Sequence, residues 1–189
     1  VLVVKEIVVG AAIAFAVGVA FAAAQLAGSL IDVIVGFAFA NVVDPLQNTQ
    51  VSVMGQVYGL TAAVVFLAID GHELLLAGVV RSFETVPVTA MPSLHDLAAT
   101  AVASTGDLLA AGLEIAAPIV VTLVVTDVAM GFLARLAPQM NIFGIELPGK
   151  ILAMFALLVV TAPFLVGSIG SHLGNGIDNA FHVIGVMTP

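Results

Sequence analysis

The chain has 189 residues, 61% of them hydrophobic and 8% charged, with a net charge of -8 and a mean hydropathy of +1.24. Soluble proteins carry about a quarter charged residues, so this composition excludes an ordinary soluble domain. It indicates an integral membrane protein or part of a very hydrophobic assembly. Four basic residues are too few for the basic stripe of a nucleic-acid-binding protein, and the lack of cysteine excludes disulfides and thiolate metal sites.

The first apolar region spans residues 2–40 and is interrupted by few polar side chains. As one helix it would be roughly 58 Å long, about twice the ~30 Å hydrocarbon core of a bilayer. We therefore expect two helices, or one bent helix that leaves the bilayer. Small residues recur at four-residue steps and predict close helix packing in two series, which are Gly10, Ala14, Gly18 and Ala22, then Gly28, Gly36 and Ala40 with Asp32 interposed between Gly28 and Gly36.

A polar break at residues 41–50 contains Pro45 and several amides, and it predicts a loop. The next apolar segment, 51–69, predicts a second helix that ends at the turn signal Asp70-Gly71. A short helix then follows up to Pro87.

Ser93 is the predicted N-cap of a further helix, because Asp96 follows three residues later in an arrangement like a capping box. We expect this helix to reach Pro118, and a separate apolar segment to cover residues 119–136. The window "RLAPQMNIFGIELPGK" follows, from Arg135 to Lys150.

The segment 151–167 is apolar and contains Pro163, where we expect a kink. The tail from Ser168 is rich in Gly and Asn, and its weak pattern predicts no spanning helix. No repeat of fixed period is present. One helical domain fits residues 1–189 best.

Ionisable groups within apolar helices cost about 2.5 to 3.5 kcal/mol each on insertion scales, so each needs a partner or water. They could form an ion or proton pathway, or they could pack between helices or face a wet lumen. The second interpretation is favoured, because perturbed polar groups also serve structure. The predicted buried polar residues are Gln25, Asp32, Glu114 and Asp127, and Arg135 stands eight residues beyond Asp127, too far for a direct pair within one helix.

The four histidines are scattered without the spacing of metal ligands, so we expect no metal site. "GSIGSH" (167–172) places Ser near His but lacks the strand-turn-helix context of a nucleophile elbow. "HLGNGID" (172–178) lacks the preceding strand and following Lys of a phosphate-binding loop. The sequence therefore predicts no enzyme activity and no cofactor.

The stretch "APIVVTLVVTDVAMGFLARLAPQMNIFGIELPGKI" (117–151) resembles the FliR family of flagellar export-gate proteins and its virulence-secretion relatives, the SctT group. Three further stretches resemble the family in the same order: "KEIVVGAAIAFAVG" (5–18), "AGSLIDVIVGFAFANVVDP" (27–45) and "FLAIDGHELLLAGVVRSFETVP" (66–87). The residues of the first stretch that carry the resemblance are Asp127, Gly131, Arg135, Pro138, Gln139, Asn141, Phe143, Pro148 and Lys150.

The resemblance covers nearly the whole chain apart from the C-terminal tail. Members usually carry one or two more apolar segments before the Lys-Glu element, so this chain, which begins at Val1, is expected to lack an N-terminal part.

The resemblance implies an all-α membrane or membrane-associated protein of helical hairpins, with long, kinked helices that stack in a hetero-oligomeric export gate. It implies FliP-, FliQ- and FlhB-type partners, with an FlhA-type component nearby. Unfolded flagellar proteins would be the cargo, and the place would be the bacterial inner membrane at the flagellar basal body. The alternative is a secondary transporter or ion channel fragment that uses Asp32, Glu114 and Asp127, but we see no repeated halves with matching broken helices.

Two local hypotheses follow. The first is a hairpin tip in which Arg135 ends one helix favourably, Pro138 stops it and Pro148 opens the next. The amides Gln139 and Asn141 would fix the turn and contact neighbouring subunits, with Phe143 as a packing anchor.

The second hypothesis concerns residues 35–50, where Gly36, Phe37 and Phe39 could form a compliant apolar plug in a protein-conducting pore. Ordinary helix packing explains these phenylalanines equally well.

Overall fold

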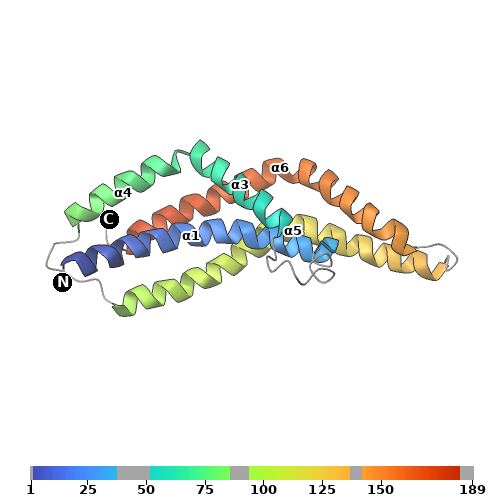
Figure 1. The fold of residues 1–189 in the computed structure, drawn as a ribbon, viewed down its shortest axis with the longest axis horizontal. Helices are drawn as coiled ribbons and strands as arrows, with labels where there is room; N and C mark the ends of the chain where they lie inside the picture. Colours follow the sequence, from blue (N-terminus) through green and yellow to red (C-terminus); the bar gives the residue numbers. More distant parts are fainter. Residues whose placement is uncertain (1, 38–51, 86–93, 137–141, 184–189) are drawn as a thin grey trace, which may run out of the picture.

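The computed structural model describes residues 2–37, 52–85, 94–136 and 142–183, and these residues are almost entirely helical. The all-α prediction is confirmed. The helices in chain order are α1 (Leu2–Val35), α3 (Val53–Ala68), α4 (Gly71–Thr85), α5 (Leu94–Leu136) and α6 (Ile142–Val183) (Figure 1).

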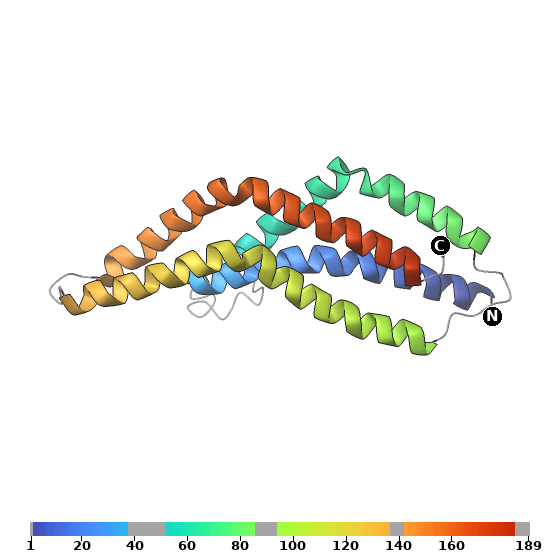
Figure 2. The same ribbon diagram turned by 180° about the vertical axis from the view of Figure 1, so that it is seen from behind.

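The helices form an elongated body in which α1, α5 and α6 run along the long axis (Figures 1 and 2). The start of α1, the end of α4, the start of α5 and the end of α6 gather at one end of the molecule. At the opposite end, the last part of α5 and the first part of α6 extend together beyond α1 as a hairpin. We call this hairpin, residues 124–136 and 142–155, the distal hairpin.

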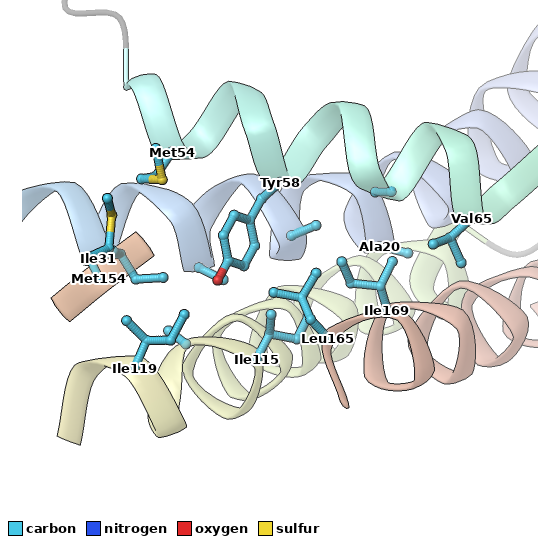
Figure 3. Close-up of a cluster of buried hydrophobic side chains, with 14 of the residues drawn as sticks. Ala20, Ile31, Met54, Tyr58, Val65, Ile115, Ile119, Met154, Leu165 and Ile169 are labelled. Carbon is cyan, nitrogen blue, oxygen red and sulfur yellow. The ribbon is translucent and has the colours of Figure 1, made fainter. Parts of the chain in front are cut away.

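One core joins four of the helices, because each presents a buried stripe with the three- and four-residue spacing of one helix face. Tyr58 lies at its centre and contributes the largest fully buried side chain (Figure 3). The other core residues form one stripe on each helix: Ala20, Ala24, Ala27, Ile31 and Val35 in α1, Met54, Ala62 and Val65 in α3, Ile115, Ile119 and Leu123 in α5, and Leu165, Ile169 and Leu173 in α6.

The first apolar region forms one helix and not two, since α1 is continuous over 34 residues. At 1.5 Å per residue it is about 51 Å long, which exceeds the hydrocarbon thickness as expected. Of the second series of small residues, Gly28 packs within this chain, because its backbone lies directly against the backbone of Met54 and Gly55, whereas Ala40 lies outside the described residues. In the first series, Gly10 and Gly18 face open space.

Two predictions based on proline are wrong, namely those that placed helix boundaries at Pro118 and Pro148. Pro118 lies inside α5, so the predicted boundary between residues 118 and 119 does not exist, and Pro148 lies inside α6 instead of opening it. The neighbouring helices hold the chain on both sides of Pro118, where Ile115 and Ile119 are buried in the core. Both α5 and α6 are bent near the middle of their length, and Pro163 lies in that part of α6, as expected for a kink (Figures 1 and 2).

The tail from Ser168, for which no spanning helix was predicted, continues α6 to Val183, and the candidate span Gly144–Gly176 includes its first residues. Leu165, Ile169 and Leu173 follow one another at four-residue steps and are 5%, 1% and 1% exposed. Their packing against the core stabilises helix despite the Gly and Asn residues around them.

The turn predicted at Asp70-Gly71 is present. The Asp70 backbone has a φ of 55°, and α3 and α4 meet there at a bend of 67°. The Asp70 carbonyl accepts the Leu74 amide at 3.2 Å, which starts the next helix. The predicted loop at 41–50, Pro87 and Ser93 lie outside the described residues.

Among the described residues, three helical spans are long and apolar enough to cross a membrane: Glu6–Val35, Ala101–Leu136 and Gly144–Gly176. The bent pair Val53–Ala68 and Gly71–Val80 would make a fourth if it acts as one span.

Candidate functional site

The junction between α1 and α3 is built around Asp32, whose side chain is 5% exposed. One carboxylate oxygen accepts the Ser52 hydroxyl at 2.6 Å, and both accept the Met54 amide at 3.1 and 3.2 Å. Ser52 is the N-cap of α3 and accepts the Gly55 amide at 2.8 Å. Negative charge is favourable at a helix N-terminus, so Asp32, buried as predicted, fixes the start of α3 against α1.

Gln25 lies on the same junction but is exposed, which corrects its predicted burial. Its side chain borders Gly59 of α3 in a polar groove of about 520 Å³ that also contains Ser29 and Gln56. The groove is open because Gly55 and Gly59 present no side chains there.

The end of α1 contains two of the three residues of the plug hypothesis. Gly36 has a φ of 98°, a backbone conformation that favours glycine, and the amide of Phe37 donates to the Asp32 carbonyl at 3.0 Å. Phe37 packs against the core, which agrees with ordinary helix packing, the alternative to the plug. Phe39 lies outside the described residues.

An ion-pair cluster connects the two arms of the distal hairpin. The Lys150 ammonium lies 2.7 Å from an Asp127 carboxylate oxygen and 3.0 Å from a Glu146 carboxylate oxygen. Asp127 is on α5, whereas Lys150 and Glu146 are one turn apart on α6. The lysine side chain is 13% exposed and Asp127 is 37% exposed, so Asp127 is only partly buried. The cluster fixes the register between α5 and α6.

Glu114 was predicted as buried, but its side chain is 64% exposed. It lies 3.5 Å from the imidazole nitrogen Nε2 of His172 on α6. Glu114 also borders a groove between α1, α5 and α6.

The predicted hairpin-tip motif is only partly described. Arg135 is exposed in the last turn of α5, as predicted for a residue that ends the helix. Phe143 belongs to the first turn of α6 and not to the connection, and its side chain is not among those described. Pro138, Gln139 and Asn141 lie outside the described residues.

One group of ligand-type side chains occurs at the bend between α3 and α4. Ligand atoms of Asp70, His72 and Glu73 lie within 4.8 Å of one another, and all three residues are exposed. Exposed acidic groups commonly gather without an ion, so this group does not define a metal centre.

Large apolar side chains cover much of the outer surface. On the distal hairpin these exposed residues are Val124, Val125, Val128, Phe132, Leu133, Leu136, Ile145, Leu147, Leu152 and Phe155. Contiguous apolar surface of this kind marks contact with lipid or with other proteins. The polar groups described above act in capping, pairing and groove formation, and they do not form a nucleophile-base arrangement within the described residues.

The fold and these contacts therefore define an all-helical membrane protein whose long helices retain large apolar faces beyond their shared core. Comparison with known proteins places it more narrowly. The family described as bacterial export proteins, family 1, matches residues 1–176, and the chain belongs to this family.

Individual relatives agree with the family. The chain is 36% identical over 159 residues to the flagellar biosynthetic protein FliR of Bacillus subtilis, covering 82% of this chain and 61% of that protein. It is 33% identical over 179 residues to FliR of Escherichia coli, covering 94% and 68%. It is 29% identical over 172 residues to the surface presentation of antigens protein SpaR of Shigella sonnei, covering 90% and 66%. The chain thus spans about two thirds of the length of these relatives.

Several residues of the site were not predicted. Ser52 stands directly before an apolar run, which is an N-cap signal that could have been recognised. The i,i+4 spacing of Glu146 and Lys150 could also have been found. The contacts of Asp127 with Lys150 and of Glu114 with His172 join different helices, and no local pattern indicates them.

Proposed function

We propose that this protein is a subunit of a type III protein export gate and acts through assembly instead of catalysis. It would form, with FliP- and FliQ-type proteins, the channel through which unfolded flagellar proteins leave the cytoplasm. An FlhB-type protein would contact this channel, with an FlhA-type component nearby. The location would be the bacterial cytoplasmic membrane at the flagellar basal body.

Family membership carries this proposal, because the family matches residues 1–176 and two FliR proteins are more than 30% identical to the chain. These two identities exceed the 29% to SpaR, whereas FliR proteins of three other bacteria lie at 24 to 26%, so the flagellar form is proposed on the form of the motif at residues 117–151.

The structure supports assembly independently. The distal hairpin has apolar residues on its outer surface and an ion-pair cluster between its arms. The cluster gives the hairpin a fixed register, so that its outer residues form a constant surface. Such a surface suits lateral contact with other helices, where close packing replaces contact with lipid.

The alternative, a transporter that couples ions through Asp32, Glu114 and Asp127, receives less support from the contacts. Asp32 caps α3, Asp127 pairs with Lys150, and Glu114 lies beside His172. Each carboxylate therefore has its own partner on a helix other than its own, and the three do not converge on one site. A coupling site is expected instead near the bilayer midplane, where discontinuous helices meet around one site.

Co-expression of the protein in its full natural length with FliP- and FliQ-type proteins, followed by native mass spectrometry, tests the proposal. We expect a stable hetero-oligomer that contains one copy of this chain. A monomer or homodimer that moves a small solute in liposomes would instead establish the transporter.

A further inference from the structure

A groove of about 520 Å³ opens between the middle of α1, the first half of α5 and the last part of α6. The first half of α5 diverges there from α1 and α6 in both views (Figures 1 and 2). The α1 wall consists of small side chains at Ala16, Ala20 and Ala23. On the α6 wall, Gly176 approaches Ala20 so closely that an added Cβ would lie 3.2 Å from the Ala20 Cβ. Because the side chains on these two walls are small, the backbone of another helix can approach them closely.

The groove also has a charge that its own lining does not balance. Asp107 and Glu114 border it from α5, and both are exposed. They are seven residues apart, so they lie on one face of the helix about two turns from each other. His172 contributes an imidazole 3.5 Å from Glu114, and the described lining contains no Lys or Arg.

Both carboxylates belong to a helical span that is apolar enough to cross a membrane, Ala101–Leu136. Ionised groups in such a span face water or pair with an opposite charge, because lipid contact is costly. A cation on an incoming helix would satisfy them, and this complementarity selects a basic occupant over a purely apolar one.

We propose that this groove, called here the α1–α5–α6 groove, seats a helix of another gate subunit that carries Lys or Arg toward Asp107 and Glu114. This inference rests on the proposed function. The small α1 wall admits the helix backbone, and the carboxylates fix its register. The occupant is expected to be a helix, because within a membrane a helix satisfies all of its own backbone hydrogen bonds.

Charge reversal tests the pairing in the co-expressed gate. The D107K/E114K variant should lower the yield of the purified hetero-oligomer and the export of flagellar protein at least tenfold. Glu73→Lys, the same change at an exposed carboxylate outside the groove, serves as the control and should keep parental values. Selection for restored motility should then return Lys→Glu or Arg→Glu changes in a helix of a partner subunit.

Two substitutions of Ala by the larger Phe test whether the groove binds a helix. Ala110 borders the groove, whereas Ala77 on α4 lies outside both the groove and the distal hairpin, and both are exposed. Ala110→Phe should block assembly, whereas Ala77→Phe should have the smaller effect. Both proteins should unfold at the same temperature as the parent when purified alone, which excludes a simple folding defect.

Three results would overturn the inference: normal export by D107N/E114Q, normal assembly of Ala110→Phe, or suppressors that map only to this chain. In each case the proposed function could stand, because the parent would still form the gate. If the parent itself neither assembles with FliP- and FliQ-type proteins nor supports export, the proposed function fails as well.

Discussion

Replacing Gly28 by Ala should push α3 away from α1. An added Cβ would lie 2.5 Å from the Gly55 nitrogen and closer still to the Met54 carbonyl group. These are backbone atoms, so they cannot turn aside as a flexible side chain would. Ordinary contact begins at 3.4 Å, and α3 must therefore retreat by about 1 Å.

The retreat would also lengthen the hydrogen bonds that Asp32 accepts from Ser52 and Met54. Overpacking costs about 1 to 3 kcal/mol, and hydrogen bonds to charged groups contribute about 1.5 to 3 kcal/mol each. Because the two effects overlap, we expect a loss of about 3 kcal/mol. For a chain of this size, that corresponds to a melting temperature about 6 to 12 °C lower.

The assay is thermal unfolding of the purified protein in detergent, followed by circular dichroism. Gly18→Ala is the matched control, because it makes the same change in the same helix where nothing lies within 4 Å of the added Cβ. The control should be unchanged or more stable by up to ~1 kcal/mol, since Ala favours helix over Gly. Equal melting temperatures for the two variants would refute the proposed contact between α1 and α3.

The other predictions concern the hairpin tip, the plug and the ion-pair cluster. The double change of Gln139 and Asn141 to Ala should reduce recovery of the hetero-oligomer in pull-down experiments, and parental recovery with normal export would reduce this motif to a simple connection. Substitution of Gly36 and Phe39 should make cells leak ions, measured by membrane-potential dyes, and absence of a leak together with normal export would exclude the plug. Lys150→Met leaves two carboxylates facing each other and should lower the free energy of unfolding, as thermal unfolding would show. The expected loss lies between the roughly 1 kcal/mol of an exposed ion pair and the about 3 to 5 kcal/mol of a broken buried pair. An unchanged melting temperature would show that the cluster does not stabilise the hairpin.

Local chemistry was sufficient to predict that the apolar segments are helical and that the chain turns at Asp70-Gly71. A Gly after Asp between apolar runs favours a turn wherever it occurs, and the structure places the bend there. Proline was a poorer guide, because Pro118 and Pro148 read as helix boundaries although both lie inside helices. In packed membrane helices, neighbouring helices and local adjustment compensate for the hydrogen bond that proline removes.

Tertiary contacts account for the remaining differences. The Gly and Asn content of the tail predicted no spanning helix. The buried residues Leu165, Ile169 and Leu173, at four-residue spacing, instead stabilise a helix there by packing against the core. The pairing of Asp127 with Lys150 depends on how α5 and α6 align, which no window of sequence contains. Phe143 could be placed in a helix only when the start of α6 was known.

The length of α1 has a consequence for the surrounding lipid. Its apolar span, Glu6–Val35, has 30 residues and is about 45 Å long. To bury that length in a hydrocarbon layer of ~30 Å, the helix would need to tilt by roughly 48°, beyond the 0 to 40° observed for membrane helices. Tilting alone cannot resolve this mismatch. Either the bilayer thickens around the protein, or part of α1 lies outside the hydrocarbon layer and is covered by protein.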